Sequence, residues 1–190
     1  MNKLLFAACL CALVSCGARY DPAPPNATAG TYHNGVYPRF SDEDPFDWTG
    51  IRPGRYPIHG IDVSKYQGDI DWRAVRHSGV SFAYIKATEG GDHLDEKFME
   101  NWRGAVRGGV PHGAYHFYYF CRTAAEQARW FIKNVPRDRN ALPPVLDIEW
   151  NHQSRTCPGK PAANHIRSEM TTFIKILTAH YGRRPLIYTT

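Results

Sequence analysis

The sequence lacks the features that mark several classes of protein. It has no dense run of lysine and arginine that would follow a nucleic-acid backbone, although its formal charge is +5 and its pI is about 9.0. It also has no glycine-rich phosphate loop, no internal repeat and no low-complexity block. We therefore expect no nucleic-acid partner and no cofactor, and we interpret the positive charge as a mild attraction to a polyanionic surface such as a cell wall.

A metal centre is not expected either. His112 and His116 are four residues apart, which on a helix would suggest zinc, but Pro111 and the neighbouring aromatic residues favour a strand. No cysteine or histidine cluster accompanies them. The sequence therefore contains no recognisable set of metal ligands.

The apolar run at the N-terminus, Leu4–Val14, is too short to span a bilayer as a helix. With Lys3 before it and small residues after it, this run predicts a signal peptide over residues 1–15. Leu13–Cys16 resembles a bacterial lipobox, so acyl chains on Cys16 are expected to anchor the exported protein to a membrane, facing the periplasm or the cell surface. An ordinary secretory signal with an incidental cysteine is the alternative.

Few cysteines remain for the rest of the chain. Removal of residues 1–15 would lower the total from five to three, and lipid on Cys16 would leave Cys121 and Cys157. Each follows a predicted strand, so the two can meet at the same end of a sheet and form a disulfide in an oxidising compartment. Closing that loop would contribute roughly 4 kcal/mol in the chain-entropy model. Two free thiols are the alternative.

The chain changes character near residue 57. Residues 16–57 are rich in Pro, Gly, Asn, Thr and Asp and are predicted to be a tether. From residue 58 onward, strand patterns alternate with helix patterns, which argues for a parallel sheet with helices outside it. The predicted strands are 59–63, 80–87, 112–120, 145–150 and 185–190, and the predicted helices are 71–77, 96–107, one that Thr123 caps, and 163–181.

The fourth of these strands, Val145–Trp150, carries two carboxylates on an otherwise apolar segment. Strand alternation places Asp147 and Glu149 on one face. Repulsion and desolvation oppose this arrangement unless one carboxyl holds a proton, and a carboxyl that is protonated near neutral pH can act as a general acid. An edge strand with a solvated face would explain the same pattern.

Five segments together resemble the glycoside hydrolase family 25 lysozymes, the Chalaropsis-type muramidases. They match the family's motifs in order over about residues 58–190: His59–Ser64, Ile85–Gly90, Gly113–Tyr118, Leu146–Glu149 and Leu186–Thr189. The resemblance implies an irregular TIM-like (β/α) barrel, of which this chain carries roughly the first five strands. Family members add closing strands and a further active-site aspartate, for which we find no counterpart here, so we expect the 58–190 domain to be incomplete at its C-terminus.

The resemblance also implies the activity and the roles of the residues. The expected reaction is hydrolysis of the β-1,4 bond between N-acetylmuramic acid and N-acetylglucosamine in peptidoglycan, with Glu149 as the acid and then the base. Acids at positions i and i+2 of a strand project side by side and cannot easily flank a sugar, so attack by the substrate's own acetamido group, oriented by Asp147, is favoured. A direct-displacement or inverting route that involves Asp62 stays open.

Other positions are expected to bind the glycan. Lys86 and Glu89 match sugar-binding positions, with a simple surface ion pair as the alternative, and Tyr115 and Tyr188 would stack on sugar rings unless they belong to the core. Asp62 would approach the pocket from another strand, unless it only caps a turn. We expect a monomer whose partners are peptidoglycan glycan strands and the membrane, and a truncated, inactive peptidoglycan-binding lipoprotein is the competing function.

Overall fold

The computed structural model describes residues 56–151 and 154–189. The predicted signal peptide, the lipidation site Cys16 and nearly all of the predicted tether lie outside the described residues. Within the described part of the chain, no helix combines the length and the apolar character needed to cross a membrane. The fold below is that of the predicted catalytic domain.

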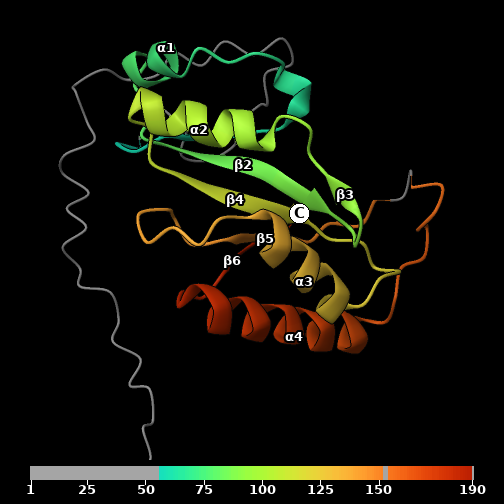
Figure 1. Cartoon of the computed structure of the whole chain (residues 1–190). Helices are drawn as coiled ribbons and strands as arrows, with labels where there is room; N and C mark the ends of the chain where they lie inside the picture. The colour runs from blue at the N-terminus through green and yellow to red at the C-terminus, as the bar shows by residue number, and fades with distance from the viewer. Residues whose placement is uncertain (1–55, 152–153, 190) are drawn as a thin grey trace, which may run out of the picture. The chain divides into compact units, whose positions relative to one another are not determined.

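The centre of this domain is a parallel sheet (Figure 1). Its strands lie in the order β1-β2-β4-β5-β6, and a short sixth strand, β3, pairs antiparallel with β2. The sheet curls into half of a barrel, so the predicted TIM-like α/β fold is confirmed. The strands are β1 (Gly60–Val63), β2 (Phe82–Glu89), β3 (His93–Leu94), β4 (His112–Phe117), β5 (Val145–Asp147) and β6 (Leu186–Tyr188).

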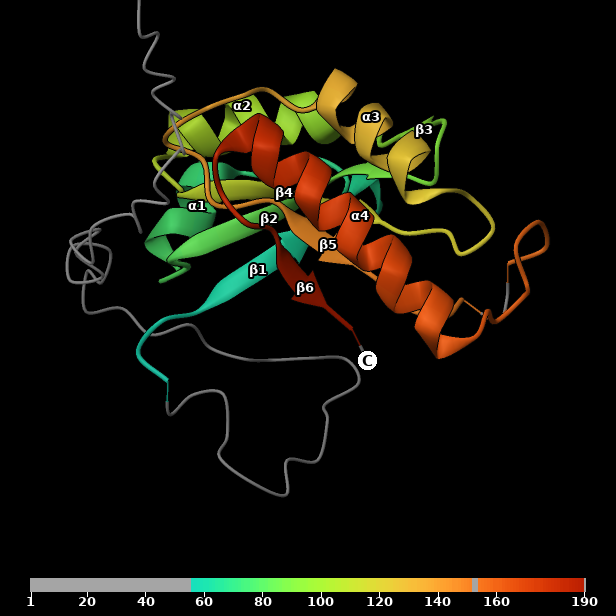
Figure 2. The same cartoon turned by 90° about the horizontal axis from the view of Figure 1, so that it is seen from below.

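The helices cover one side of the sheet, and Figure 2 shows no described helix on the other side. Side chains cap three of them: Ser64 caps η2, Asp71 accepts from two backbone amides at the start of α1, and Thr123 caps α3 as predicted. Gly182 ends α4 in the left-handed conformation. The helices are the 3-10 helix η2 (Lys65–Gln67), α1 (Trp72–His77), α2 (Phe98–Gly108), α3 (Ala124–Asn134) and α4 (Ala163–Tyr181).

The hydrophobic core lies between these helices and the convex face of the sheet. Ala83, Ile85 and Ala87 alternate along β2 and are fully buried, and Phe131 and Phe173 cover the sheet from α3 and α4. The small side chains of β2 let the helices approach closely. The side chains between them in the sequence point to the opposite, concave face.

The predicted element boundaries differ from the structure mainly at the strand ends. Strands predicted to reach residues 120 and 150 end at Phe117 and Asp147. These two residues form the last register pair of β4 and β5, and just beyond it the Tyr118 N–H still donates to the Asp147 carbonyl at 2.8 Å. The sequence analysis also missed β3 and η2, which are too short to show a periodic pattern.

Candidate active site

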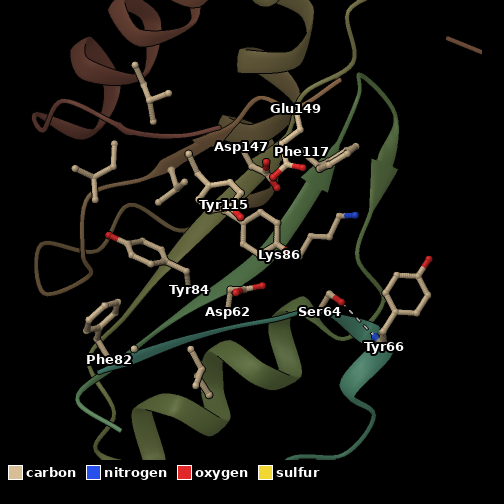
Figure 3. A pocket seen from close by; sticks show the side chains of 16 residues that line it. Asp62, Ser64, Tyr66, Phe82, Tyr84, Lys86, Tyr115, Phe117, Asp147 and Glu149 are labelled. Carbon is tan, nitrogen blue, oxygen red and sulfur yellow. Dashed lines mark hydrogen bonds between the residues drawn. The ribbon is translucent and has the colours of Figure 1, made fainter. Parts of the chain in front are cut away.

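A pocket of about 550 Å³ opens on the concave face of the sheet. Figure 3 shows charged and aromatic side chains from several strands directed into it. The carboxyl ends of parallel strands meet at one edge of a sheet, which brings together residues that are far apart in the sequence. The pocket is lined by Gly60, Ile61, Asp62, Ser64, Tyr66, Phe82, Tyr84, Lys86, Tyr115, Phe117, Val145, Asp147, Glu149, Leu186, Ile187 and Tyr188.

Strand alternation produces most of this lining. Phe82, Tyr84 and Lys86 are every second residue of β2, and Tyr115 and Phe117 continue the same face on β4. Gly113 occupies the preceding position of this face, where a Cβ atom would lie 2.5 Å from the ring of Tyr84. The absence of a side chain at Gly113 therefore lets the Tyr84 ring lie against the sheet.

Asp147 and Glu149 project into the pocket close to each other. Asp147 is the last residue of β5, and the backbone N–H of Ile148 donates to the carbonyl of Tyr188 at 2.9 Å, which keeps the chain extended beyond the strand. Glu149 therefore faces the same side as Asp147, as the alternation predicts. Asp62 faces both from across the pocket, on β1 (Figure 3).

Among these carboxyls, Asp147 has a pKa that lies well above its ordinary value. Burial raises the pKa of Asp147 to about 7, and the negative charge of Glu149 acts in the same direction. Lys86 opposes this shift, whereas Asp62 and Glu89 add to it. The Oδ1 atom of Asp147 is buried without a hydrogen-bond partner among the described residues. The pocket therefore favours one proton on this carboxyl pair near neutral pH.

Lys86 supplies positive charge to the pocket. Its Nζ lies 2.5 Å from Oε2 of Glu89 and 4.9 Å from the centre of the Phe117 ring. Both charged side chains are largely buried, at 13% and 19% exposure, so the pair is screened less than a surface ion pair.

The structure brings six of the seven predicted catalytic and substrate-binding residues into the pocket lining: Asp62, Lys86, Tyr115, Asp147, Glu149 and Tyr188. Glu89 is not part of this lining but forms an ion pair with Lys86. The sequence analysis missed Tyr66, Tyr84 and Phe117. Tyr84 and Phe117 could have been found from their i±2 spacing to Lys86 and Tyr115, whereas Tyr66 follows the strand and carries no such signal.

A disulfide joins Cys121 and Cys157, whose Cα atoms are 5.6 Å apart. The bridge connects the loop after β4 with the segment that follows Glu149. It therefore ties together two loops at the edge of the sheet where the carboxylates lie.

Within residues 56–151 and 154–189, no group of three or more histidine, cysteine, aspartate or glutamate side chains is arranged to hold a metal ion. His116, considered above as a metal ligand, is fully buried beneath the convex face. Thr88 and Gln127 satisfy its two ring nitrogens at 2.7 and 3.0 Å.

The family model for glycosyl hydrolases family 25 matches residues 61–190. The chain belongs to this family. The match covers the curled sheet, its helices and every residue of the carboxylate group. The family-model match thus confirms the resemblance to family 25 that the sequence motifs indicated.

Known proteins similar to this chain include YegX of Escherichia coli, 34% identical over 98% of this chain and 69% of its own length. Lysozyme M1 of Streptomyces globisporus is 40% identical over 70% of this chain and 46% of its own length. The structure of a family 25 glycosyl hydrolase from Bacillus anthracis superposes with a TM-score of 0.67 at 41% identity, over 71% of this chain and 61% of that one. The chain therefore spans about half to two thirds of the length of these relatives.

Proposed function

We propose that this protein is an exported peptidoglycan hydrolase, a lysozyme that cleaves the β-1,4 bond between N-acetylmuramic acid and N-acetylglucosamine. The observation that carries the proposal is the pocket in which Asp147, Glu149 and Asp62 converge beside Lys86. Relatives named lysozyme and N,O-diacetylmuramidase support the choice of substrate. The concave, aromatic lining suits the faces of sugar rings.

In the proposed reaction, the acetamido oxygen of the substrate attacks the anomeric carbon while the glycosidic bond breaks. Glu149 donates its proton to the departing oxygen and then takes a proton from the water that opens the cyclic intermediate. Asp147 accepts a hydrogen bond from the acetamido N–H and so orients the attacking oxygen. The side-by-side projection of the two carboxyls supports this route over direct displacement.

Substrate binding supplies the reason for the proton to move to Glu149. In the free pocket, burial and the charge of Glu149 raise the pKa of Asp147 to about 7. An acetamido N–H that donates to Asp147 would stabilise its ionised form and lower this pKa. The proton shared by the pair would then reside on Glu149, where the leaving oxygen needs it.

The remaining pocket residues would bind and polarise the glycan. Asp62 lies across the pocket on β1, so its charge can stabilise positive charge that develops on the sugar. Lys86 can donate to sugar oxygens, and Tyr115 and Tyr188 offer aromatic faces. Burial raises the pKa of Tyr115, which keeps its hydroxyl a hydrogen-bond donor.

The domain organisation belongs to the same proposal. Residues 1–15 would direct export, acyl chains on Cys16 would anchor the protein, and residues 16–57 would link the anchor to the catalytic domain at 58–190. The disulfide between Cys121 and Cys157 supports an oxidising compartment. The protein would act as a monomer on glycan strands near the membrane.

Mass spectrometry of the soluble fragments released from purified peptidoglycan tests the activity. We expect fragments with reducing-end N-acetylmuramic acid from the wild type, and a loss of at least 100-fold in Glu149→Gln, because removal of a general acid typically costs 10²–10⁴-fold. Glu100→Gln, on the surface of α2, is the matched control and should retain activity.

Two outcomes would contradict the proposal. One is equal activity in Glu149→Gln. The other is a wild type that sediments with insoluble peptidoglycan but releases no fragments, which would instead support a wall-binding lipoprotein.

A further inference from the structure

Glu89 pairs in register with Phe117 at the ends of β2 and β4 and forms an ion pair with Lys86, although it is not among the residues that line the pocket. Its Oε2 accepts from Lys86 Nζ at 2.5 Å, and its Oε1 accepts a hydrogen bond from the Tyr119 hydroxyl. Both carboxylate oxygens are therefore engaged by protein groups. Burial alone would raise the pKa of Glu89, but the hydrogen bonds from Lys86 and Tyr119 lower it below its ordinary value. Glu89 is thus held as an anion.

Tyr119 is fixed in turn by the fully buried side chain of Gln127. The backbone N–H of Tyr119 donates to Gln127 Oε1 at 2.9 Å, and Gln127 Nε2 donates to the Tyr119 carbonyl at 3.0 Å. His116 also contacts the Gln127 oxygen, at 3.0 Å. These contacts hold the Tyr119 backbone at its N–H and at its carbonyl, while the hydroxyl at the other end of the residue donates to Glu89.

The turn after β2 leaves room for the Tyr119 ring. Gly90 has a φ of +54°, and a Cβ atom there would lie 3.1 Å from the ring. Burial raises the pKa of Tyr119 to about 12, and the neighbouring Glu89 acts in the same direction, so the hydroxyl keeps its proton and donates to Glu89. Tyr119 therefore connects Gln127, which binds its backbone, with the Glu89 carboxylate that pairs with Lys86.

This chain of contacts restricts an otherwise flexible cation. A lysine side chain has a flexible four-carbon stem and loses substantial rotamer freedom when its ammonium group is bound by other side chains. Here Glu89 and the Phe117 ring both hold the ammonium group. An ammonium has three N–H donors, and Glu89 uses one of them, so the others can be offered to a ligand in the pocket.

We propose that Tyr119 and Glu89 are positioning residues that hold Lys86 at the edge of the pocket, where its ammonium donates to hydroxyl or acetamido oxygens of the glycan beside Asp147. The substrate part of this inference rests on the proposed function. The Lys86 charge also lowers the proton affinity of Asp147, whose other charged neighbours are Glu149, Asp62 and Glu89, with Tyr115 and Tyr188 facing the same pocket.

The decisive variant is Tyr119→Phe, which removes only the hydroxyl. Its matched control is Tyr118→Phe, the adjacent residue in the sequence, whose hydroxyl contacts Glu169 and the Arg122 carbonyl instead. A ¹⁵N NMR spectrum of the purified protein should show a protected Lys86 ammonium resonance in the wild type and in Tyr118→Phe. That resonance should be lost in Tyr119→Phe and in Glu89→Gln.

Kinetics on soluble glycan oligomers from peptidoglycan test the consequence for binding. Tyr119→Phe should raise KM about five- to tenfold with kcat within twofold of the wild type, while Tyr118→Phe changes neither. Glu89→Gln should add little in a Lys86→Met background, because Glu89 acts through Lys86.

The spectrum and the kinetics separate the two proposals. A Lys86 resonance that persists in Tyr119→Phe overturns the positioning role whether or not the protein cleaves peptidoglycan. An unchanged KM in an active Tyr119→Phe variant, or full additivity of Glu89→Gln with Lys86→Met, overturns the substrate role of the contact. A wild type without cleavage contradicts the proposed function alone.

Discussion

The two faces of the parallel sheet carry different side chains, although the same strands supply both. On the convex face, Ala83, Ile85 and Leu146 are fully buried beneath the helices. On the concave face, Tyr84, Lys86 and Asp147 alternate with them and line the pocket. One face holds the fold together by apolar burial, and the other places charges in a partly desolvated site. Substitutions one residue apart should therefore have opposite consequences.

The largest expected effect on stability is on the convex face. Leu146→Ala should lower the free energy of unfolding by about 2–5 kcal/mol, because it leaves a cavity in a well-packed core. Denaturant unfolding measures this loss. The activity of the remaining folded protein should be nearly unchanged, and a loss below about 1 kcal/mol would show that the two faces do not divide as described.

His116 makes the convex face sensitive to acid. Burial lowers its pKa from 6.5 to about 4. Because the folded-state pKa is depressed, its contribution to stability is fully present above pH 6.5 and is lost as the pH falls through about 4. The gap corresponds to about 3 kcal/mol at most.

Urea unfolding between pH 7.5 and 4 measures this loss, and His116→Gln should remove most of the pH dependence while retaining an amide near Gln127. The same pH dependence in both proteins would show that another group is responsible.

The smallest predicted effect on stability concerns Asp147. Its contribution is favourable at low pH and is lost at high pH, which is the opposite of the pH dependence expected for His116. The pKa of Asp147 is raised from 3.8 to about 7, so its favourable contribution is complete below pH 3.8 and is lost as the pH rises through about 7. Asparagine stays neutral at every pH. Asp147→Asn should therefore stabilise the protein at pH 8 by about 1–2 kcal/mol, after allowance for solvent screening of a half-buried group, and by little near pH 3.5.

Thermal unfolding at the two pH values tests this difference. Asp92→Asn, which affects only an exposed ion pair with Arg122, should change stability by less than about 0.5 kcal/mol. Destabilisation of Asp147→Asn at pH 8 would contradict the assignment of the proton.

The sequence predicted those features of the two sheet faces that depend on a periodic pattern of side chains. Alternation of apolar and other residues identified the five parallel strands and placed Asp147 and Glu149 on one face. Long helical spacing predicted α4 at its observed limits, 163–181. The same alternation would have identified Tyr84 and Phe117 as pocket residues.

Other features depend on distances that no periodic pattern contains. Glu89 was expected to bind sugar, which stays a prediction; its contacts with Lys86 and Tyr119 at the ends of β2 and β4 could not be read from the sequence. The sequence also offered no reason to prefer Asp147 over Glu149 as the holder of the proton. The raised pKa of Asp147 follows from its burial and its charged neighbours, which only the folded chain defines.

On the concave face, burial and the charge of Glu149 raise the pKa of Asp147 to about 7. A ¹³C NMR titration of the aspartate side-chain carboxyls tests it most directly, with the Asp147 resonance assigned by its loss in Asp147→Asn. We expect a midpoint for Asp147 near 7 in the wild type, and a lower midpoint in Glu149→Gln because the neighbouring charge is removed. A midpoint near 4 in the wild type, or the same midpoint in both proteins, would contradict the claim.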